Sequence, residues 1–229
     1  MQPYYEDDLV TLYHGDCMEL ADAWTCADVL VSDPPYGRAW RQGRLTARYE
    51  ADNSHAGIAG DATTKTRDDA LTTWGERPAV IFGDLMLAPP DGVKQVLVFQ
   101  KPPDAGVRGA TAGFRRDIEA IYLLGKGWTS GIGGRSSVLT TRATTAGGTG
   151  SIQGKTGHPH AKPGDIVQTL IAKCPPGVIA DPFAGSGSTL VAAKALGRKA
   201  IGVELEEKYC EVAAKRLAQD VIDLSGWSA

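Results

Sequence analysis

Seven short apolar segments run along the chain and alternate with helix-like or polar segments. Several are continuous apolar runs rather than alternating ones, which is typical of strands in a parallel sheet that is covered on both faces. Two later segments have helical spacing: one begins near Ser188 and ends at Gly197, and one covers residues 207–221. Strands mixed with helices predict an α/β fold. The predicted strands are residues 9–13, 28–32, 79–82, 95–99, 118–124, 177–180 and 200–203.

The length of 229 residues suits one large domain with insertions. Hydrophobic residues make up 42% of the chain and charged residues 22%, which argues against a wholly disordered protein. Two segments have no clear periodicity: residues 38–76 are polar and mixed, and residues 129–157 are rich in Gly, Ser and Thr. Because long loops in a compact domain are usually functional or disordered, we predict a single domain over residues 1–229, with an insertion at 38–76 and a short functional loop at 129–157.

Several protein classes are excluded by what the sequence lacks. No window contains the roughly 20 consecutive apolar residues of a membrane span. Residues 1–10 lack the basic region of a signal peptide. The four cysteines have no CxxC spacing, which excludes a disulfide scaffold and a zinc knuckle. We therefore expect a cytoplasmic protein with no membrane partner.

Two basic segments stand out against a net charge of −3. With this net charge, a polyanion has to be bound by a local patch and not by bulk charge. Residues 120–164 contain no acidic residue, and residues 38–48 contain four arginines. A solvated surface is the alternative explanation for either segment. Their basic residues are Arg38, Arg41, Arg44, Arg48, Lys126, Arg135, Arg142, Lys155 and Lys162.

A glycine-rich turn, DPFAGSGST at residues 181–189, joins a predicted strand to a predicted helix. Glycine lets the backbone approach a ligand closely, and the free N–H groups at a helix start favour a carboxylate or phosphate. Glu204 ends the next strand, where doubly wound sheets commonly place an acid that binds ribose hydroxyls. The two features predict a site for a nucleoside-containing cofactor. The alternative is a structural turn, and the missing Gly-Lys-Ser/Thr excludes a P-loop.

A second motif, Asp33-Pro34-Pro35-Tyr36, follows another predicted strand. The two prolines fix an extended backbone and donate no hydrogen bond, so their carbonyls and the Asp33 carboxylate can face one small spot lined with acceptors. Such a spot suits an NH₂ group, and the Tyr36 ring offers a flat face for a planar base. A turn between strand and loop is the alternative.

The third motif is His158-Pro159-His160-Ala161-Lys162-Pro163, followed by an apolar helix pattern over residues 166–171. The His-x-His spacing suggests a metal, but no Asp, Glu or Cys nearby supplies a third ligand. We therefore predict no metal here.

Together these motifs resemble the β group of S-adenosylmethionine-dependent DNA amino-methyltransferases, in which the catalytic motif comes first and the cofactor motif last. The turn at residues 13–16, YHGD, and the segments 96–102 and 119–128 are also similar to this family. The similarity covers residues 9–37, 78–128 and 156–219. It implies a Rossmann-like, seven-stranded, mostly parallel sheet with helices on both faces, S-adenosylmethionine as cofactor without a metal, and double-stranded DNA as substrate.

The resemblance also implies roles for individual residues. The target base would be held and stacked by Asp33, Pro34, Pro35 and Tyr36. The cofactor would be bound by Asp16, His158, Lys162, Asp181, Phe183, Gly185, Gly187, Ser188 and Glu204, with Lys162 near its carboxylate. DNA phosphates would be contacted by Arg38, Arg41, Arg44, Arg135, Arg142 and Lys155. Larger members carry a target-recognition region where this chain has only residues 129–157, so the recognised sequence is expected to be short or to involve residues 38–76.

Several alternatives stay open from the sequence. Asp33 at the first motif position favours adenine N6, whereas N4-cytosine members more often have serine there. Two further interpretations remain. One is a methyltransferase that acts on RNA or on a protein amide, and the other is a non-catalytic module that binds S-adenosylmethionine or DNA. A nicotinamide dehydrogenase would share the glycine-rich turn but does not explain the other two motifs. The family implies a bacterial or phage-infected cell and often a homodimer. The sequence does not separate restriction protection with a partner nuclease from other roles.

Overall fold

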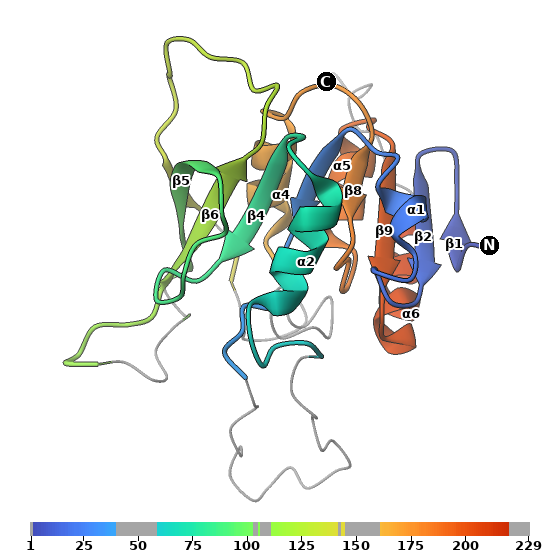
Figure 1. Cartoon of the computed structure of the whole chain (residues 1–229), viewed down its shortest axis with the longest axis horizontal. Coiled ribbons are helices and arrows are strands. Elements are labelled where there is room, and N and C mark those ends of the chain that lie inside the picture. Colours follow the sequence, from blue (N-terminus) through green and yellow to red (C-terminus); the bar gives the residue numbers. More distant parts are fainter. Residues whose placement is uncertain are drawn as a thin grey trace, which may run out of the picture.

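The computed structural model describes residues 2–39, 59–102, 105, 111–141, 143–144 and 161–219. Within these residues, nine strands form one sheet in the order β1-β2-β9-β8-β3-β4-β6-β5-β7 (Figure 1). The strands are β1 (Tyr5–Glu6), β2 (Val10–His14), β3 (Val29–Ser32), β4 (Ala79–Gly83), β5 (Val93–Gln100), β6 (Ile118–Leu124), β7 (Val138–Thr140), β8 (Ile179–Asp181) and β9 (Ala200–Glu204). The mixed, mostly parallel sheet confirms the predicted Rossmann-like α/β class.

Five adjacent strands, β2, β9, β8, β3 and β4, run parallel. β6 is antiparallel to both β4 and β5, while β5 and β7 are parallel to each other. β1 pairs with β2 in antiparallel fashion at the opposite end of the sheet. Because the parallel strands all point the same way, the segments that follow β3, β4, β8 and β9 meet at one edge, which we call the carboxyl edge.

Helices cover both faces of the sheet (Figure 1). On one face lie α1 (Ala21–Trp24) and α2 (Lys65–Trp74); on the other lie α4 (Gly164–Ile171), α5 (Ser188–Ala195) and α6 (Glu207–Leu217). Alternate residues of β3 face opposite sides: Val29 and Val31 pack into the core under α4, α5 and α6, whereas Leu30 packs into the core under α1 and α2. The second core includes the stacked rings of Trp24 and Trp74, whose centroids are 6.0 Å apart.

The seven predicted strands correspond to β2, β3, β4, β5, β6, β8 and β9 within one or two residues at each end. The structure adds two strands to the expected seven, β1 of two residues and β7 of three, both at sheet edges. Segments this short are defined by their pairing with a neighbour and not by an apolar run of their own, which is why periodicity does not indicate them. The predicted helix over residues 207–221 ends earlier, at Leu217, and α2 lies inside the segment predicted as an insertion.

In the part of the chain that the structure describes, no helix has the length and apolar character needed to cross a membrane.

Candidate active site

Three carboxylates follow or end three neighbouring strands at the carboxyl edge. Asp33 comes directly after β3, Asp181 ends β8 and Glu204 ends β9. The strand order β9-β8-β3 places them side by side, so the fold brings the predicted base-binding motif next to the predicted cofactor motif. Residues that are far apart in the sequence therefore form one candidate site.

The chain turns sharply after the Asp33-Pro34-Pro35-Tyr36 motif. Gly37 has φ +86°, and a Cβ added there would lie 2.6 Å from the Thr63 carbonyl carbon. The backbone N–H groups of Gly37 and Arg38 both donate to Asp61 Oδ1, at 2.7 and 3.2 Å. Only glycine fits this close approach, and the turn leads the chain away from the motif toward the segment before α2.

Both oxygens of the Asp33 carboxylate have a donor in the structure. The Tyr36 hydroxyl donates to Asp33 Oδ1 at 2.9 Å, and the Lys162 ammonium lies 2.5 Å from Asp33 Oδ2. Lys162 comes just before α4, its side chain is only 8% exposed, and Nζ lies 5.4 and 5.1 Å from the ring centroids of Tyr36 and Phe82. The sequence led us to expect Lys162 at the cofactor carboxylate. In the structure its ammonium contacts the Asp33 carboxylate of the predicted base-binding motif, and the cofactor contact stays a prediction.

Two further side chains belong to this site and were missed by sequence reasoning. Glu119 lies on β6, with Oε2 3.5 Å from Lys162 Nζ and 3.3 Å from the Tyr36 hydroxyl. Lys101 follows β5, and its Nζ is 2.7 Å from Glu119 Oε1. Asp33, Tyr36, Lys101, Glu119 and Lys162 form what we call the partly buried charge cluster. Its two carboxylates and two ammonium groups balance in charge.

Burial and mutual contacts change the pKa values within this cluster. Burial raises the pKa of Asp33, the Lys162 ammonium opposes that rise and the Glu119 carboxylate adds to it. Burial would also raise the pKa of Glu119, but Lys162 and Lys101 outweigh it and the net direction is downward. The two carboxylates raise the pKa of Lys162 despite its burial. Burial together with Asp33 and Glu119 holds the pKa of Tyr36 well above its usual value. Glu119 is therefore an anion at neutral pH, Lys162 a cation and Tyr36 a neutral hydroxyl donor.

The Asp181 side chain accepts hydrogen bonds from the end of β3 and from the glycine-rich turn. Its carboxylate is 2% exposed, and its Oδ1 accepts hydrogen bonds from the Ser32 hydroxyl at 2.5 Å and from the Phe183 N–H at 3.1 Å. These bonds connect the ends of β3 and β8. Burial raises the pKa of Asp181 to about 6, although hydrogen bonds from Ser32 and Thr189 oppose the rise. The side chain stabilises the turn at the junction of the two motifs.

Glu204 is tied to the same turn. Its Oε2 accepts the Gly185 N–H at 2.7 Å and its Oε1 accepts the Glu206 N–H at 2.8 Å. Burial raises its pKa, and these backbone donors oppose the rise. Asp16 comes shortly after β2, which pairs with β9. His14 at the end of β2 is the pairing partner of Glu204 at the end of β9, so Asp16 lies close to Glu204 in the fold.

The start of α5 suits a bound ligand. Gly187 precedes the helix at φ +79°, and a Cβ there would lie 2.9 Å from Ala213 Cβ, so the turn packs directly on α6. Among the buried side-chain nitrogen and oxygen atoms of the described residues, only the Ser188 Oγ has no hydrogen-bond partner. An unpaired buried hydroxyl is costly unless a ligand satisfies it. The turn, Ser188 and the nearby Glu204 therefore fit the nucleoside cofactor that the sequence predicts.

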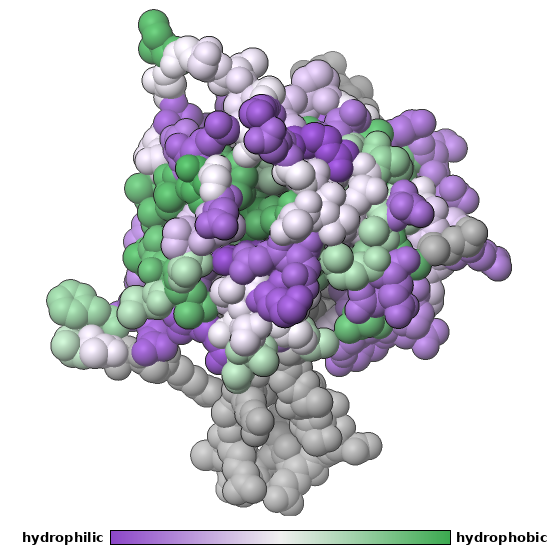
Figure 2. Space-filling view, in the orientation of Figure 1, coloured by the Kyte–Doolittle hydropathy of each residue, from purple (hydrophilic) through white to green (hydrophobic). Residues whose placement is uncertain are grey.

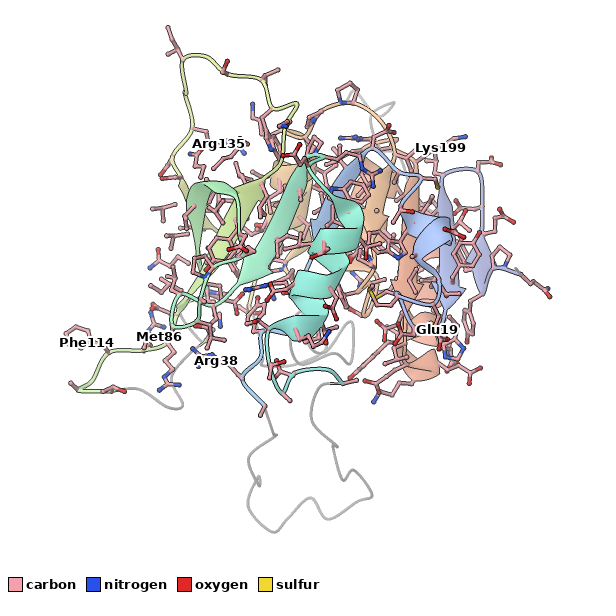
Figure 3. All side chains as sticks on the ribbon, in the orientation of Figure 1. Glu19, Arg38, Met86, Phe114, Arg135 and Lys199 are labelled. Atoms are coloured by element: carbon pink, nitrogen blue, oxygen red, sulfur yellow. The ribbon has the colours of Figure 1, made fainter. Side chains whose placement is uncertain are left out.

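The basic residues predicted to contact DNA do not all lie together. Arg38 follows the predicted catalytic motif and forms an ion pair with Asp84. Figure 3 shows Arg38 at the end of the sheet that also carries Met86 and Phe114, whereas Arg135 lies toward the opposite end, where Lys199 is found. Arg135 borders a hollow of about 240 Å³ between β7 and α4. The other residues predicted to contact DNA lie outside the described part of the chain: Arg41, Arg44, Arg142 and Lys155. His158, predicted to bind the cofactor, also lies outside it.

Comparison with known proteins gives a consistent result. A family model described as DNA methylase, of the N6/N4 type, matches residues 135–215. The protein named "Putative methylase YubD" from Escherichia coli (strain K12) is 32% identical over 212 residues, which are 89% of this chain and 88% of YubD.

Two solved structures have a similar fold. The complex of M1.HpyAVI with SAM has a TM-score of 0.64 at 20% identity, covering 92% of this chain and 100% of that one. The cytosine-N4-specific PvuII DNA methyltransferase has a TM-score of 0.66 at 15% identity, covering 98% and 92%. At these identities the two structures support the fold alone.

Proposed function

Since the chain belongs to the DNA amino-methyltransferase family, we propose that it transfers a methyl group from S-adenosylmethionine to the N6 amine of adenine in double-stranded DNA. The observation that carries this proposal is the adjacency of the Asp33 motif and the glycine-rich turn at the carboxyl edge. A base held by the first motif and a cofactor held by the second would then meet between β3 and β8.

The Asp33 motif suits an exocyclic amine. The lone pair of such an amine is delocalised into the ring, so it is a poor nucleophile. Hydrogen bonds from the NH₂ group to the Asp33 carboxylate and the Pro34 carbonyl would draw the nitrogen toward tetrahedral geometry. They would also stabilise the positive charge that develops there. Pro35 keeps the segment extended, and the Tyr36 ring offers a face for the base.

The glycine-rich turn and its neighbours suit the cofactor. S-adenosylmethionine supplies an electrophilic methyl group on a sulfonium. Glu204 would accept the ribose hydroxyls, Asp16 would lie near the adenine, and the segment from Asp181 to Ser188 would hold the methionine part with Phe183, Gly185 and Gly187. His158 is a further proposed contact. In this arrangement the chain mainly orients two reactants, which is an effective way to lower a bimolecular barrier.

In double-stranded DNA, the target base would have to leave the base stack to reach this site. A base inside a duplex does not reach an edge pocket, so we propose that the target nucleotide is flipped out, at a cost of a few kcal/mol. Phosphate contacts offset that cost, and they make binding depend on salt. Arg38 lies closest in sequence to the catalytic motif among the predicted contacts, and Arg41, Arg44, Arg142 and Lys155 remain proposed contacts.

The family's frequent dimerisation leads us to propose a homodimer through a part of one sheet face that none of the described helices covers. Val96, Ile118 and Val138 are about half exposed, and strand register places them on the same face as Tyr122. Figure 2 shows hydrophobic residues gathered over β5 and β6 in this region, whereas α2 presents mainly hydrophilic ones. An apolar face of this kind is typical of an association surface.

The proposal can be tested in a bacterial host that has no DNA methylation of its own. We expect genomic DNA from cells expressing the wild-type chain to contain N6-methyladenine, measured as nucleosides by mass spectrometry. Asp33→Ala should abolish the modified base while leaving S-adenosylmethionine binding within a few-fold. The matched control is Asp22→Ala, an exposed acid in the first turn of α1, which should retain full modification.

Other outcomes of this experiment are informative. N4-methylcytosine in place of N6-methyladenine would overturn the choice of base and keep the mechanism. Normal methylation by Asp33→Ala would overturn the assignment of the catalytic motif. A soluble chain that binds S-adenosylmethionine but modifies no DNA would favour an RNA substrate or a non-catalytic module. Long-read mapping of the modified genome would then identify the target sequence and its relation to any nuclease.

A further inference from the structure

Glu119 is the second carboxylate of the partly buried charge cluster, and it lies within reach of both groups that donate to Asp33. The Tyr36 hydroxyl is 2.9 Å from Asp33 Oδ1 and 3.3 Å from Glu119 Oε2. The Lys162 ammonium is 2.5 Å from Asp33 Oδ2 and 3.5 Å from Glu119 Oε2. In each case Asp33 is the nearer acceptor and Glu119 the alternative one.

We propose that Glu119 is a positioning residue that takes over the Tyr36 hydroxyl and the Lys162 ammonium when Asp33 accepts the amine of the target base. This inference rests on the proposed function and assigns a second carboxylate to the same site. Glu119 itself touches neither the base nor the cofactor in this arrangement. It acts through Tyr36 and Lys162.

The Tyr36 hydroxyl and the Lys162 ammonium need a second acceptor when Asp33 binds the target amine. A tyrosine hydroxyl has one proton, so it donates to one carboxylate at a time. An ammonium group 2.5 Å from Asp33 Oδ2 competes with the target amine for the same oxygen. It also places positive charge beside a nitrogen that becomes positive during methyl transfer. Moving Lys162 toward Glu119 removes both the competition and the unfavourable charge.

Lys101 fits this role as the partner that keeps Glu119 ionised. It lies 2.7 Å from Glu119 Oε1, the oxygen that faces neither Tyr36 nor Lys162, and it is 28% exposed. With Glu119 neutral, the cluster would carry Lys101, Lys162 and one carboxylate, and hence a net charge of +1. An excess positive charge in a partly buried site raises the barrier for a reaction that builds up positive charge.

Glu119→Gln tests the proposal because it keeps the size of the side chain and removes its charge. In assays with unmethylated genomic DNA, we expect kcat to fall about 10- to 100-fold, by analogy with the loss of a residue that orients a metal ligand. The KM for DNA and the affinity for S-adenosylmethionine should stay within about two-fold, because Glu119 would touch neither ligand. A loss that appears only in KM would overturn the proposal.

The pH profile gives a readout that a purely structural role would not move. The charged groups facing Asp33 are Lys162 before α4, Glu119 on β6 with Lys101 beyond it, and Asp181 on β8, together with the hydroxyl of Tyr36. Removing the Glu119 charge should lower the pKa of Asp33, so the acidic limb of kcat/KM should move to lower pH. Lys101→Met removes a positive charge instead and should move the same limb to higher pH.

The control and a second measurement keep the inference separate from the proposed function. Glu76→Gln breaks an exposed Lys–Glu pair with Lys126 and should leave kcat and its pH profile unchanged. The pKa of Asp33 can also be followed by carbon NMR of the carboxyl group, assigned with Asp33→Asn, whether or not the chain methylates DNA. The role of Glu119 would be overturned if the acidic limb of kcat/KM stayed in place in both Glu119→Gln and Lys101→Met. An Asp33 pKa that is the same in these variants as in the wild type would overturn it as well. If Glu119→Gln does not fold, Lys101→Met tests the proposal alone: its acidic limb of kcat/KM should move to higher pH, and a move to lower pH would overturn the proposal. A wild-type chain that methylates no DNA would overturn only the proposed function.

Discussion

Asp181 is a carboxylate that the fold buries completely while giving it several donors. Its pKa of about 6 lies above its usual value of 3.8, so the folded chain binds the proton more tightly than the unfolded chain. The resulting stability is fully present below pH 4 and is lost as pH rises through 6. A difference of this size corresponds to roughly 3 kcal/mol at most.

Asp181→Asn should therefore become stabilising relative to the wild type as pH rises from 5 to 7, because asparagine resembles the neutral acid and can still accept from Ser32 and Phe183. Urea unfolding at a series of pH values measures this difference. The surface variant Asp22→Asn serves as the comparison and should give curves parallel to wild type. Parallel curves for Asp181→Asn would contradict the buried, raised-pKa description.

At the level of residues, the sequence predicted the acids that follow strands better than the partners they meet. Asp33 and Glu204 were identifiable because each lies in or after a motif at a strand end. Glu119 was not, because it stands in an apolar strand and its role depends on contacts with Tyr36, Lys101 and Lys162, which are between 18 and 83 residues away in the chain. Lys162 was identified as a site residue, but its contact with Asp33 was not predicted, because the two residues are 129 positions apart and meet only in the folded chain.

At the level of elements, Gly187 and Gly197 bracket α5 and differ in what surrounds them. Both have positive φ, of +79° and +65°. A Cβ at Gly187 would lie 2.9 Å from Ala213 Cβ on α6, whereas a Cβ at Gly197 would meet nothing within 4 Å. Alanine at Gly197 should thus cost only the left-handed backbone strain, about 1–2 kcal/mol.

Gly187→Ala should cost clearly more than Gly197→Ala, because it adds a clash between α5 and α6 to the same strain. It should also weaken S-adenosylmethionine binding, since the turn from Gly185 to Ser188 would have to move. Urea unfolding and titration calorimetry measure the two effects. Equal losses of stability with unchanged affinity in both variants would show that the turn does not bind the cofactor.

The success of strand prediction differs between the middle and the edges of the sheet. Central strands such as β3 and β4 are buried on both faces, so their apolar runs are visible in the sequence. The edge strands β1 and β7 bury at most one residue each, and α2 has few buried residues to create a period. Such elements are fixed by neighbours that are distant in sequence, and local periodicity carries no information about them.

At the scale of the whole molecule, the two ends of the sheet have different surroundings. The motif residues, Arg38 and the loop that carries Phe114 lie at the carboxyl edge, whereas Arg135 and Lys199 lie at the opposite end (Figure 3). A duplex that delivers a base to Asp33 would lie over the carboxyl edge. The proposed docking direction thus predicts which cations contact phosphate, a distinction that net charge and basic segments alone do not make.

Arg38→Ala should weaken binding of double-stranded DNA several-fold and reduce the slope of log affinity against log salt by about 1, because one phosphate contact is lost. The variant also leaves Asp84 without its ion-pair partner near the site, which adds to the loss. Lys199→Ala removes one exposed cation at the other end and should change neither affinity nor slope, and we expect Arg135→Ala to behave like it. Fluorescence anisotropy with a labelled duplex between 50 and 200 mM salt measures all three variants. A loss in Arg135→Ala equal to that in Arg38→Ala would mean that DNA also wraps the far end of the sheet, and the docking direction would have to be revised.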